Sequence, residues 1–184
     1  MSGDEYQADR PDIRRRIIVK KERRRVAVGE HCSVHFECFE TMRYQIHEML
    51  RVENKWDDAD AIAEELAAYN PILPGDGDLS ATVMFEYQSE QERAVELVKL
   101  LGIENHLKLV IGDTDPILAT FDLSQIGKDR ISSVQYIRWS LDDEQRALLK
   151  KDGTVVRLVI DHPSHRAQAV LSESTRREIM NDPE

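Results

Sequence analysis

LSATVMFEYQSEQERAVELVKLLG, residues 79–102, decides the fold, because its hydrophobic spacing changes in the middle. Apolar side chains alternate over its first nine residues, which predicts a β-strand with one buried face. Its second half predicts an amphipathic helix, since Ser89 occupies an N-cap position, Glu92 completes a capping box and Gly102 ends the pattern. A strand that leads directly into a helix indicates a fold that combines both kinds of element.

Upstream of this stretch the sequence predicts two helices. The first covers residues 34–54, where apolar side chains form one stripe on a helical wheel: Phe39, Met42, Ile46, Met49 and Leu50. The second covers residues 57–70 and carries acids early, where the helix dipole favours them. Prolines at 71 and 74 end it. We expect an antiparallel helical hairpin over residues 34–70.

Downstream the pattern returns to strands. Residues 106–112, 116–123, 131–141 and 154–161 predict four more strands, and residues 140–153 and 172–182 predict helices. The expected class is α+β, with an N-terminal basic arm and a helical hairpin packed on a mostly antiparallel sheet of about five strands. At 184 residues we expect a single domain, divided into an arm over 1–29, the hairpin over 34–70 and the sheet region over 79–184.

The N-terminal arm concentrates positive charge in an acidic chain. Residues 1–9 are expected to be loose, and residues 10–29 to form a short helix and an extended piece. Residues 10–25 hold nine basic and two acidic residues, a local charge of +7 in a chain of net charge −10. This segment could bind phosphates, or it could lie on the acidic body of its own chain. We favour the second interpretation, because no aromatic residue accompanies the cations to stack on bases.

Composition restricts the class of protein. Charged residues make up 33% of the chain, and no apolar run approaches the roughly 20 residues of a membrane span. The first residues lack the apolar region of a secretory signal, and two cysteines provide no disulfide framework. We therefore expect a cytoplasmic protein that does not interact with membranes.

Four residues that can bind metals lie close together: His31, Cys32, His35 and Cys38. A structural zinc site usually pairs two ligand knuckles across a longer loop, so this spacing does not favour one. No Glu-x-x-His of a di-iron bundle is present. A divalent metal stays an alternative, with these candidate ligands: His31, His35, Asp161, His162 and His165.

A polar stripe runs beside the apolar stripe of the first helix. Glu37, Thr41, Gln45 and Glu48 fall on it, and Glu53 falls within the apolar face, where an acid requires a partner. Two interpretations stay open, namely a polar pocket between this helix and the sheet, or structural ion pairs. The candidate ligand-binding residues are Glu37, Thr41, Gln45, Glu48, Arg51, Glu53, Arg138 and His162.

Four motifs resemble an uncharacterised bacterial family that is defined as a domain of unknown function. They are FExxxTxxYQIxEMLRxE (36–53), ELxxYNxxLPxxxxLSATxMxE (65–86), SSVQYIRWxL (132–141) and VIDHP (159–163). The family pattern maps onto Glu37, Thr41, Tyr44, Gln45, Glu48, Arg51, Glu53, Asn70, Ser80, Thr82, Glu86, Arg138, Asp161 and His162. It does not include Cys32 or Cys38.

Members of this family are often encoded beside rubrerythrin-like proteins and iron–sulfur proteins similar to heterodisulfide reductase. The resemblance therefore implies a part in redox metabolism or peroxide defence, with one of these proteins as partner.

Two functions follow. The first is an accessory or partner-binding cytoplasmic protein without an assembled catalytic motif, which predicts an apolar or charge-segregated surface. The second is an enzyme or binder of a metal or small ligand, which predicts that the polar candidates converge in one pocket. No catalytic residue or cofactor is assigned. Nucleic acid is not an expected partner, and a homo-oligomer is compatible with both functions.

Overall fold

The computed structural model describes residues 2–183 and confirms the α+β class. Its helices are α1 Gly3–Arg24, α2 Phe39–Glu53, α3 Ala59–Tyr69, α4 Glu90–Lys99, α5 Asp143–Lys150 and α6 Glu173–Ile179. Its strands are β1 Arg25–Ala27, β2 Cys32–Phe36, β3 Asp78–Phe85, β4 Leu107–Ile111, β5 Ile117–Leu118, β6 Thr120–Phe121, β7 Val134–Ser140, β8 Val156–His162 and β9 His165–Val170. None of the described helices is long and apolar enough to cross a lipid bilayer.

The strands form two sheets rather than the single sheet that we expected. One has the order β1-β2-β3-β7-β6 and the other β5-β4-β8-β9, and all neighbouring strands are antiparallel. The two sheets arise because the predicted strand over 116–123 breaks at the buried Ala119. Its first half pairs with β4 and its second half with β7, so the chain crosses from one sheet to the other.

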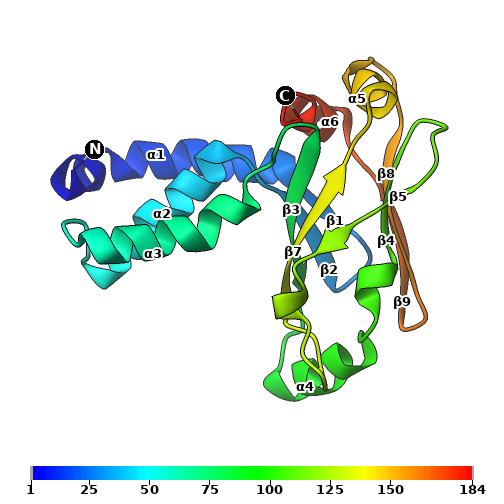
Figure 1. Cartoon of the computed structure of the whole chain (residues 1–184), viewed down its shortest axis with the longest axis horizontal. Coiled ribbons are helices and arrows are strands. Elements are labelled where there is room, and N and C mark those ends of the chain that lie inside the picture. The colour runs from blue at the N-terminus through cyan, green and yellow to red at the C-terminus, as the bar shows by residue number, and fades with distance from the viewer. Residues whose placement is uncertain (1, 184) are drawn as a thin grey trace.

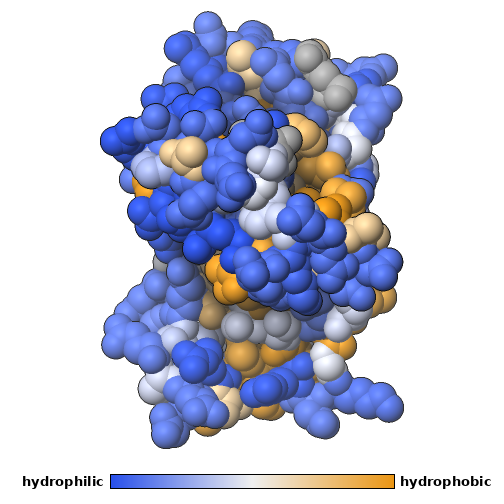
Figure 2. All heavy atoms as spheres, turned by 90° about the vertical axis from the view of Figure 1, so that its left-hand side faces the viewer, coloured by the Kyte–Doolittle hydropathy of each residue, from blue (hydrophilic) through white to orange (hydrophobic). Residues whose placement is uncertain are grey.

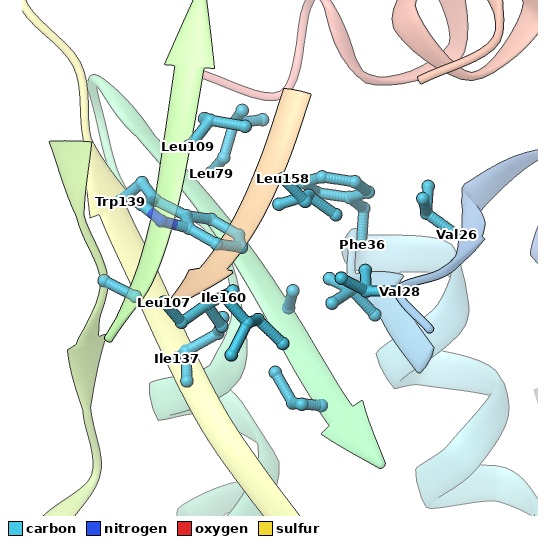
Figure 3. Packing of buried hydrophobic residues seen from close by; sticks show 14 of the residues in the cluster. Val26, Val28, Phe36, Leu79, Leu107, Leu109, Ile137, Trp139, Leu158 and Ile160 are labelled. Carbon is cyan, nitrogen blue, oxygen red and sulfur yellow. The ribbon is translucent and has the colours of Figure 1, made fainter. Parts of the chain in front are cut away.

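The hydrophobic core lies between the two sheets. The alternating residues of β3, which begin at Leu79, point into it, as predicted. Figure 3 shows Trp139 and Leu79 of one sheet meeting Leu107 and Leu158 of the other, with Phe36 beside them. The outer face of the five-stranded sheet therefore carries the intervening, polar residues of β3 and β7. Strand β9 was missed by the sequence analysis, because it is an edge strand whose residues are half-buried or exposed.

The helices α1, α2 and α3 form an arm that projects from the sheets (Figure 1). Helix α2 packs against both α1 and α3. Residues 34–36 were expected in the first helix, but they belong to β2, because they pair with Ala81–Val83 of β3. The hairpin α2–α3 is thus an insertion between two paired strands.

Helix α1 is longer than predicted. It includes residues 3–9, which were expected to be loose, because Ser2 and Glu5 form a capping box and Tyr6 is fully buried. The ring of Tyr6 packs on His47 and Trp56, with ring centroids 4.9 and 5.2 Å away. These aromatic contacts hold the start of α1 against the tip of the hairpin.

Much of the positive charge in residues 10–25 pairs with acids of the same chain, as the favoured interpretation predicts. The pairs are Arg10–Glu48, Arg15–Asp12, Lys20–Glu40, Lys20–Glu178, Arg24–Asp182, Arg24–Glu178 and Arg25–Glu86. Arg16 and Arg23 are exposed and have no carboxylate partner in residues 2–183. These two cations therefore remain available to a ligand or a partner.

Candidate functional site

Two surfaces are candidates, and the first lies on the arm. A groove of about 530 Å³ runs between α1 and α2. Ile13, Ile17 and Val19 of α1 form its apolar part, and Tyr44 contributes from α2. Ile17 is buried, whereas Val19 is 48% exposed, so part of this apolar lining is open to water.

A second pocket of about 310 Å³ opens between α2 and α3. It is lined mainly by apolar residues, including Met42, Ile46 and Leu66. Arg43 and His47 line both this pocket and the groove, so the two cavities flank one ridge of α2. On this ridge Phe39 is 60% exposed, although it starts the apolar stripe that the sequence assigns to a helix core.

The unpaired charge of this surface is positive, because the two acids that line the groove, Glu40 and Glu178, both pair with Lys20. Arg16 and Arg23 at the groove lack acidic partners in the described chain, and the guanidinium of Arg43 lies 5.4 Å from the ring centre of Phe39. Burial and the nearby Arg43 lower the pKa of His47. We call this surface the arm face. It comprises Ile13, Arg16, Val19, Arg23, Phe39, Arg43, Ile46 and Leu66.

Seen from the end of the arm, hydrophobic atoms emerge between hydrophilic ones rather than lying under a continuous polar layer (Figure 2). An apolar surface interrupted by cations is suited to binding another molecule.

The second surface lies on the outer face of the five-stranded sheet. A pocket of about 550 Å³ opens there, beneath the C-terminal end of α3. We call it the sheet-face pocket. Its polar lining residues are Tyr69, Ser80, Thr120, Asp122, Gln125, Tyr136 and Arg138.

Glu37 lies buried next to this face. Its Oε1 accepts a hydrogen bond of 2.7 Å from Thr82, and its Oε2 accepts one of 2.7 Å from Thr41. Both carboxylate oxygens are therefore satisfied by hydroxyls. Arg138 bonds Asp78 at 2.7 Å and the carbonyl oxygens of Pro71 and Leu73, which fixes the turn after α3 to β7.

The structure brings only part of the predicted ligand set together. Glu37, Thr41 and Arg138 lie around the outer sheet face, whereas Gln45, Glu48, Arg51 and Glu53 lie on the arm. His162 is at the end of β8 in the other sheet, where its Nε2 bonds the carbonyl of Leu101 at 3.1 Å.

The acids of the arm act in ion pairs. Arg10 holds Glu48 through two bonds of 2.8 Å, and Tyr6 donates to it at 2.7 Å. Arg10 above all, with Tyr6 and Arg51, lowers the pKa of Glu48 to about 2. Glu53 ends α2 and pairs with Lys55 at 2.8 Å, so it is not an acid buried in an apolar face.

The candidate metal ligands are dispersed. Within residues 2–183 no three acidic, histidine or cysteine side chains lie close enough to hold an ion. His165 bonds the carbonyl of Val28, His35 bonds Ser33, and His31 stacks on Tyr87.

The last of these candidates and the two cysteines also have structural contacts. Asp161 pairs with Lys108 and His106. Cys32 and Cys38 are buried, and burial raises the pKa of the Cys32 thiol to about 12.

The residues that characterise the two surfaces were predicted only in part: Ser80 belongs to the family pattern, but Tyr136 was not a candidate. Tyr136 and Ser80 share the outer sheet face with Arg138, and the alternation of β3 and β7 is the signal that could have identified them. Arg43 was not among the predicted candidates, because its exposure depends on how the three helices of the arm pack.

Comparison with known proteins gives a family and a structural relative. The family model described as "Protein of unknown function (DUF3501)" matches residues 1–183. A crystal structure of a novel protein of unknown function from Burkholderia pseudomallei K96243 is similar, with a TM-score of 0.92 and 33% identity over 100% of this chain and 96% of that chain. No curated protein gives a significant match. The family match confirms the resemblance of the four motifs to a family of unknown function, and the chain belongs to the DUF3501 family.

Proposed function

We propose that this chain is an accessory protein that binds a partner protein through the arm face. The observation that carries this proposal is Phe39, which begins the apolar stripe of α2 and is 60% exposed, whereas Met42 and Leu50 of the same stripe are buried. Leaving apolar surface in water costs about 25 cal/mol per Å². A face that retains such residues next to two open cavities is expected to be covered when the protein acts.

The occupant that fits this face is an amphipathic segment of another protein that presents apolar side chains and carboxylates. The groove offers Ile13 and Val19 to the apolar side chains. Arg16, Arg23 and Arg43 have no carboxylate partner in residues 2–183 and are placed to receive the acids. Complementary charge of this kind speeds encounter and sets the register of the complex.

The family resemblance supplies the candidate partner, a rubrerythrin-like or iron–sulfur redox protein encoded nearby. On this proposal the protein works in the cytoplasm, in redox metabolism or peroxide defence, without a catalytic step of its own. The dispersed positions of the polar candidates support binding over catalysis. A divalent metal has little support, because the ring nitrogens of His162 and His165 bond main-chain carbonyls.

The test is direct binding between purified proteins. The full chain is titrated by isothermal calorimetry with a rubrerythrin-like protein and, separately, with an iron–sulfur protein of the heterodisulfide-reductase type, each from the organism that encodes this chain. We expect one of them to bind, and we expect Phe39→Ser and Arg43→Glu each to weaken binding by about tenfold or more, as for interface anchors. Binding should also weaken as salt is raised.

Matched controls lie on the far sheet. Val170→Ser removes an equally exposed apolar residue of β9, and Arg166→Glu reverses an exposed cation there. Both variants should bind like the unmodified chain. The proposal is wrong if neither redox protein binds the folded chain, or if the arm and β9 variants weaken binding equally.

A further inference from the structure

The sheet-face pocket is a different cavity from those of the arm face. The pairing of β3, β7 and β6 determines which side chains form its floor. Ser80 of β3 lies opposite Arg138 of β7, which in turn lies opposite Thr120 of β6. Tyr136 is two residues before Arg138 and points to the same side. Because Leu79 and Ala81 point into the core, the side chain of Ser80 is directed to this outer face.

Several polar groups of the pocket lack hydrogen bonds. Ser80 is only 2% exposed, and its hydroxyl has no partner in the described chain. The hydroxyls of Tyr69 and Tyr136 likewise form no hydrogen bond with any of residues 2–183. Buried polar groups are nearly always paired in native proteins, so the unpaired Ser80 hydroxyl indicates a site for a ligand that forms hydrogen bonds. Tyr69 and Tyr136 are half-buried, and their hydroxyls face the same pocket from its lining.

The charged residues around the pocket indicate the sign of the ligand's charge. Arg138 is neutralised by Asp78 at 2.7 Å. Asp122 remains at the rim and Glu37 lies behind the floor, and neither has a cationic partner among the described residues. Burial, followed by Tyr69, Glu37 and Asp122, raises the pKa of Tyr136, which agrees with a negative potential in the pocket.

We propose that the sheet-face pocket binds a small organic cation, an alkylammonium group on a short aliphatic chain. The ammonium N–H groups donate to the carboxylate of Asp122 and to the hydroxyl oxygens of Ser80 and Tyr136. The aromatic faces of the two tyrosines favour a cation further. The aliphatic chain lies on Ala67, Ala68 and Pro71, which form the apolar wall below α3.

The test compares three four-carbon probes whose end groups are cationic, neutral or anionic: 1,4-diaminobutane, 1,4-butanediol and succinate. Each is titrated into the full chain at physiological salt, and binding is followed by calorimetry and by tyrosine fluorescence. We expect the diamine to bind and the diol and diacid to bind at least tenfold more weakly, since each loses a charge-assisted hydrogen bond. Asp122→Asn and Ser80→Ala should each reduce affinity for the diamine by roughly tenfold.

Ser80→Ala removes a hydroxyl that has no partner in the described chain, so it leaves the fold intact and separates binding from stability. Asp115→Asn, an exposed acid on the loop between β4 and β5, controls for general attraction to an acidic chain. The proposal is overturned if none of the probes binds, if succinate binds as well as the diamine, or if Asp115→Asn weakens binding as much as Asp122→Asn. The arm variants should not affect this site, so its failure is distinct from that of the partner proposal.

Discussion

Arg24 and Asp182 form a two-bonded ion pair across 158 positions of sequence, with Nη1–Oδ2 and Nη2–Oδ1 distances of 2.7 and 2.9 Å. The guanidinium is 3% exposed and also bonds the carbonyl oxygens of Glu37 and Glu178. One cation thus connects the end of α1, the start of α2 and the C-terminal segment. The root of the arm is thereby fixed to the sheets.

Loss of Arg24 is expected to be strongly destabilising. Arg24→Ala leaves Asp182 buried without its cation, and burial already raises the pKa of that carboxyl. Breaking a buried pair from one side costs about 3–5 kcal/mol, which urea denaturation followed by circular dichroism measures. Arg177→Ala is the control, because Arg177 is exposed and should change the free energy of unfolding by less than about 1 kcal/mol. Equal losses for the two variants would contradict this prediction.

Glu48 should stabilise the arm through Arg10 and Tyr6. Glu48→Gln removes a half-buried carboxylate that accepts from both, and we expect a loss of about 1.5–3 kcal/mol in urea denaturation at pH 7. The control is Asp12→Asn, whose pair with Arg15 is fully solvent-facing and should change stability by less than about 0.5 kcal/mol. If Glu48→Gln is as stable as Asp12→Asn, the contacts of Glu48 with Arg10 and Tyr6 contribute nothing to stability.

Thr82 and Ser80, which lie on the same face of β3, are expected to differ in their contribution to stability. Thr82→Val keeps the shape of the side chain but removes the hydroxyl that donates to Glu37, so it should cost about 1–3 kcal/mol. Ser80→Ala, two residues earlier on the same face, should cost little, because its hydroxyl has no partner in residues 2–183. Thermal and urea denaturation of both variants tests the difference. Similar losses at both positions would mean that the hydrogen bond to Glu37 is not the cause.

His35 should make stability depend on pH near neutrality. Burial, followed by Arg25, lowers its pKa from 6.5 to about 4, so between these values the unfolded chain binds a proton that the folded chain does not. Stability is therefore complete above pH 6.5 and is lost as the pH falls towards 4. Between pH 7 and pH 5 the loss should be at most ~2 kcal/mol.

Urea titrations at these two pH values, on the unmodified chain and on His35→Gln, measure the effect. The variant should lose most of the slope and keep a smaller part from His47, whose pKa burial also lowers. A variant with an unchanged slope would rule out His35 as its origin.

The sequence predicted the elements whose signal is local. Alternation in β3 and the capping box of α4 are examples, since each depends on residues close in the chain. The division into two sheets was not predictable, because it depends on pairing partners far away for the two halves of 116–123.

The candidate site shows the same limit. The helical pattern of residues 34–36 was overridden by pairing with β3. The apolar stripe of α2 is buried at Met42 and Leu50, as predicted, but its first residue, Phe39, is exposed. Glu37 was predicted from the polar stripe of the first helix, and Arg138 was a candidate on a predicted strand. Ser80 and Tyr136 look ordinary until the register of β3 and β7 places them under α3.

The insertion of α2–α3 between two paired strands has a consequence for how such proteins diversify. Strands β2 and β3 pair directly from Cys32–Phe85 to Phe36–Ala81, so the sheet does not rely on the hairpin for its register. Lengthening, shortening or exchanging the hairpin alters the loop-closure entropy only slowly with its length. The hairpin can therefore change in length and sequence while the pairing of β2 with β3 is retained. A designer can graft a different hairpin onto the same two strands.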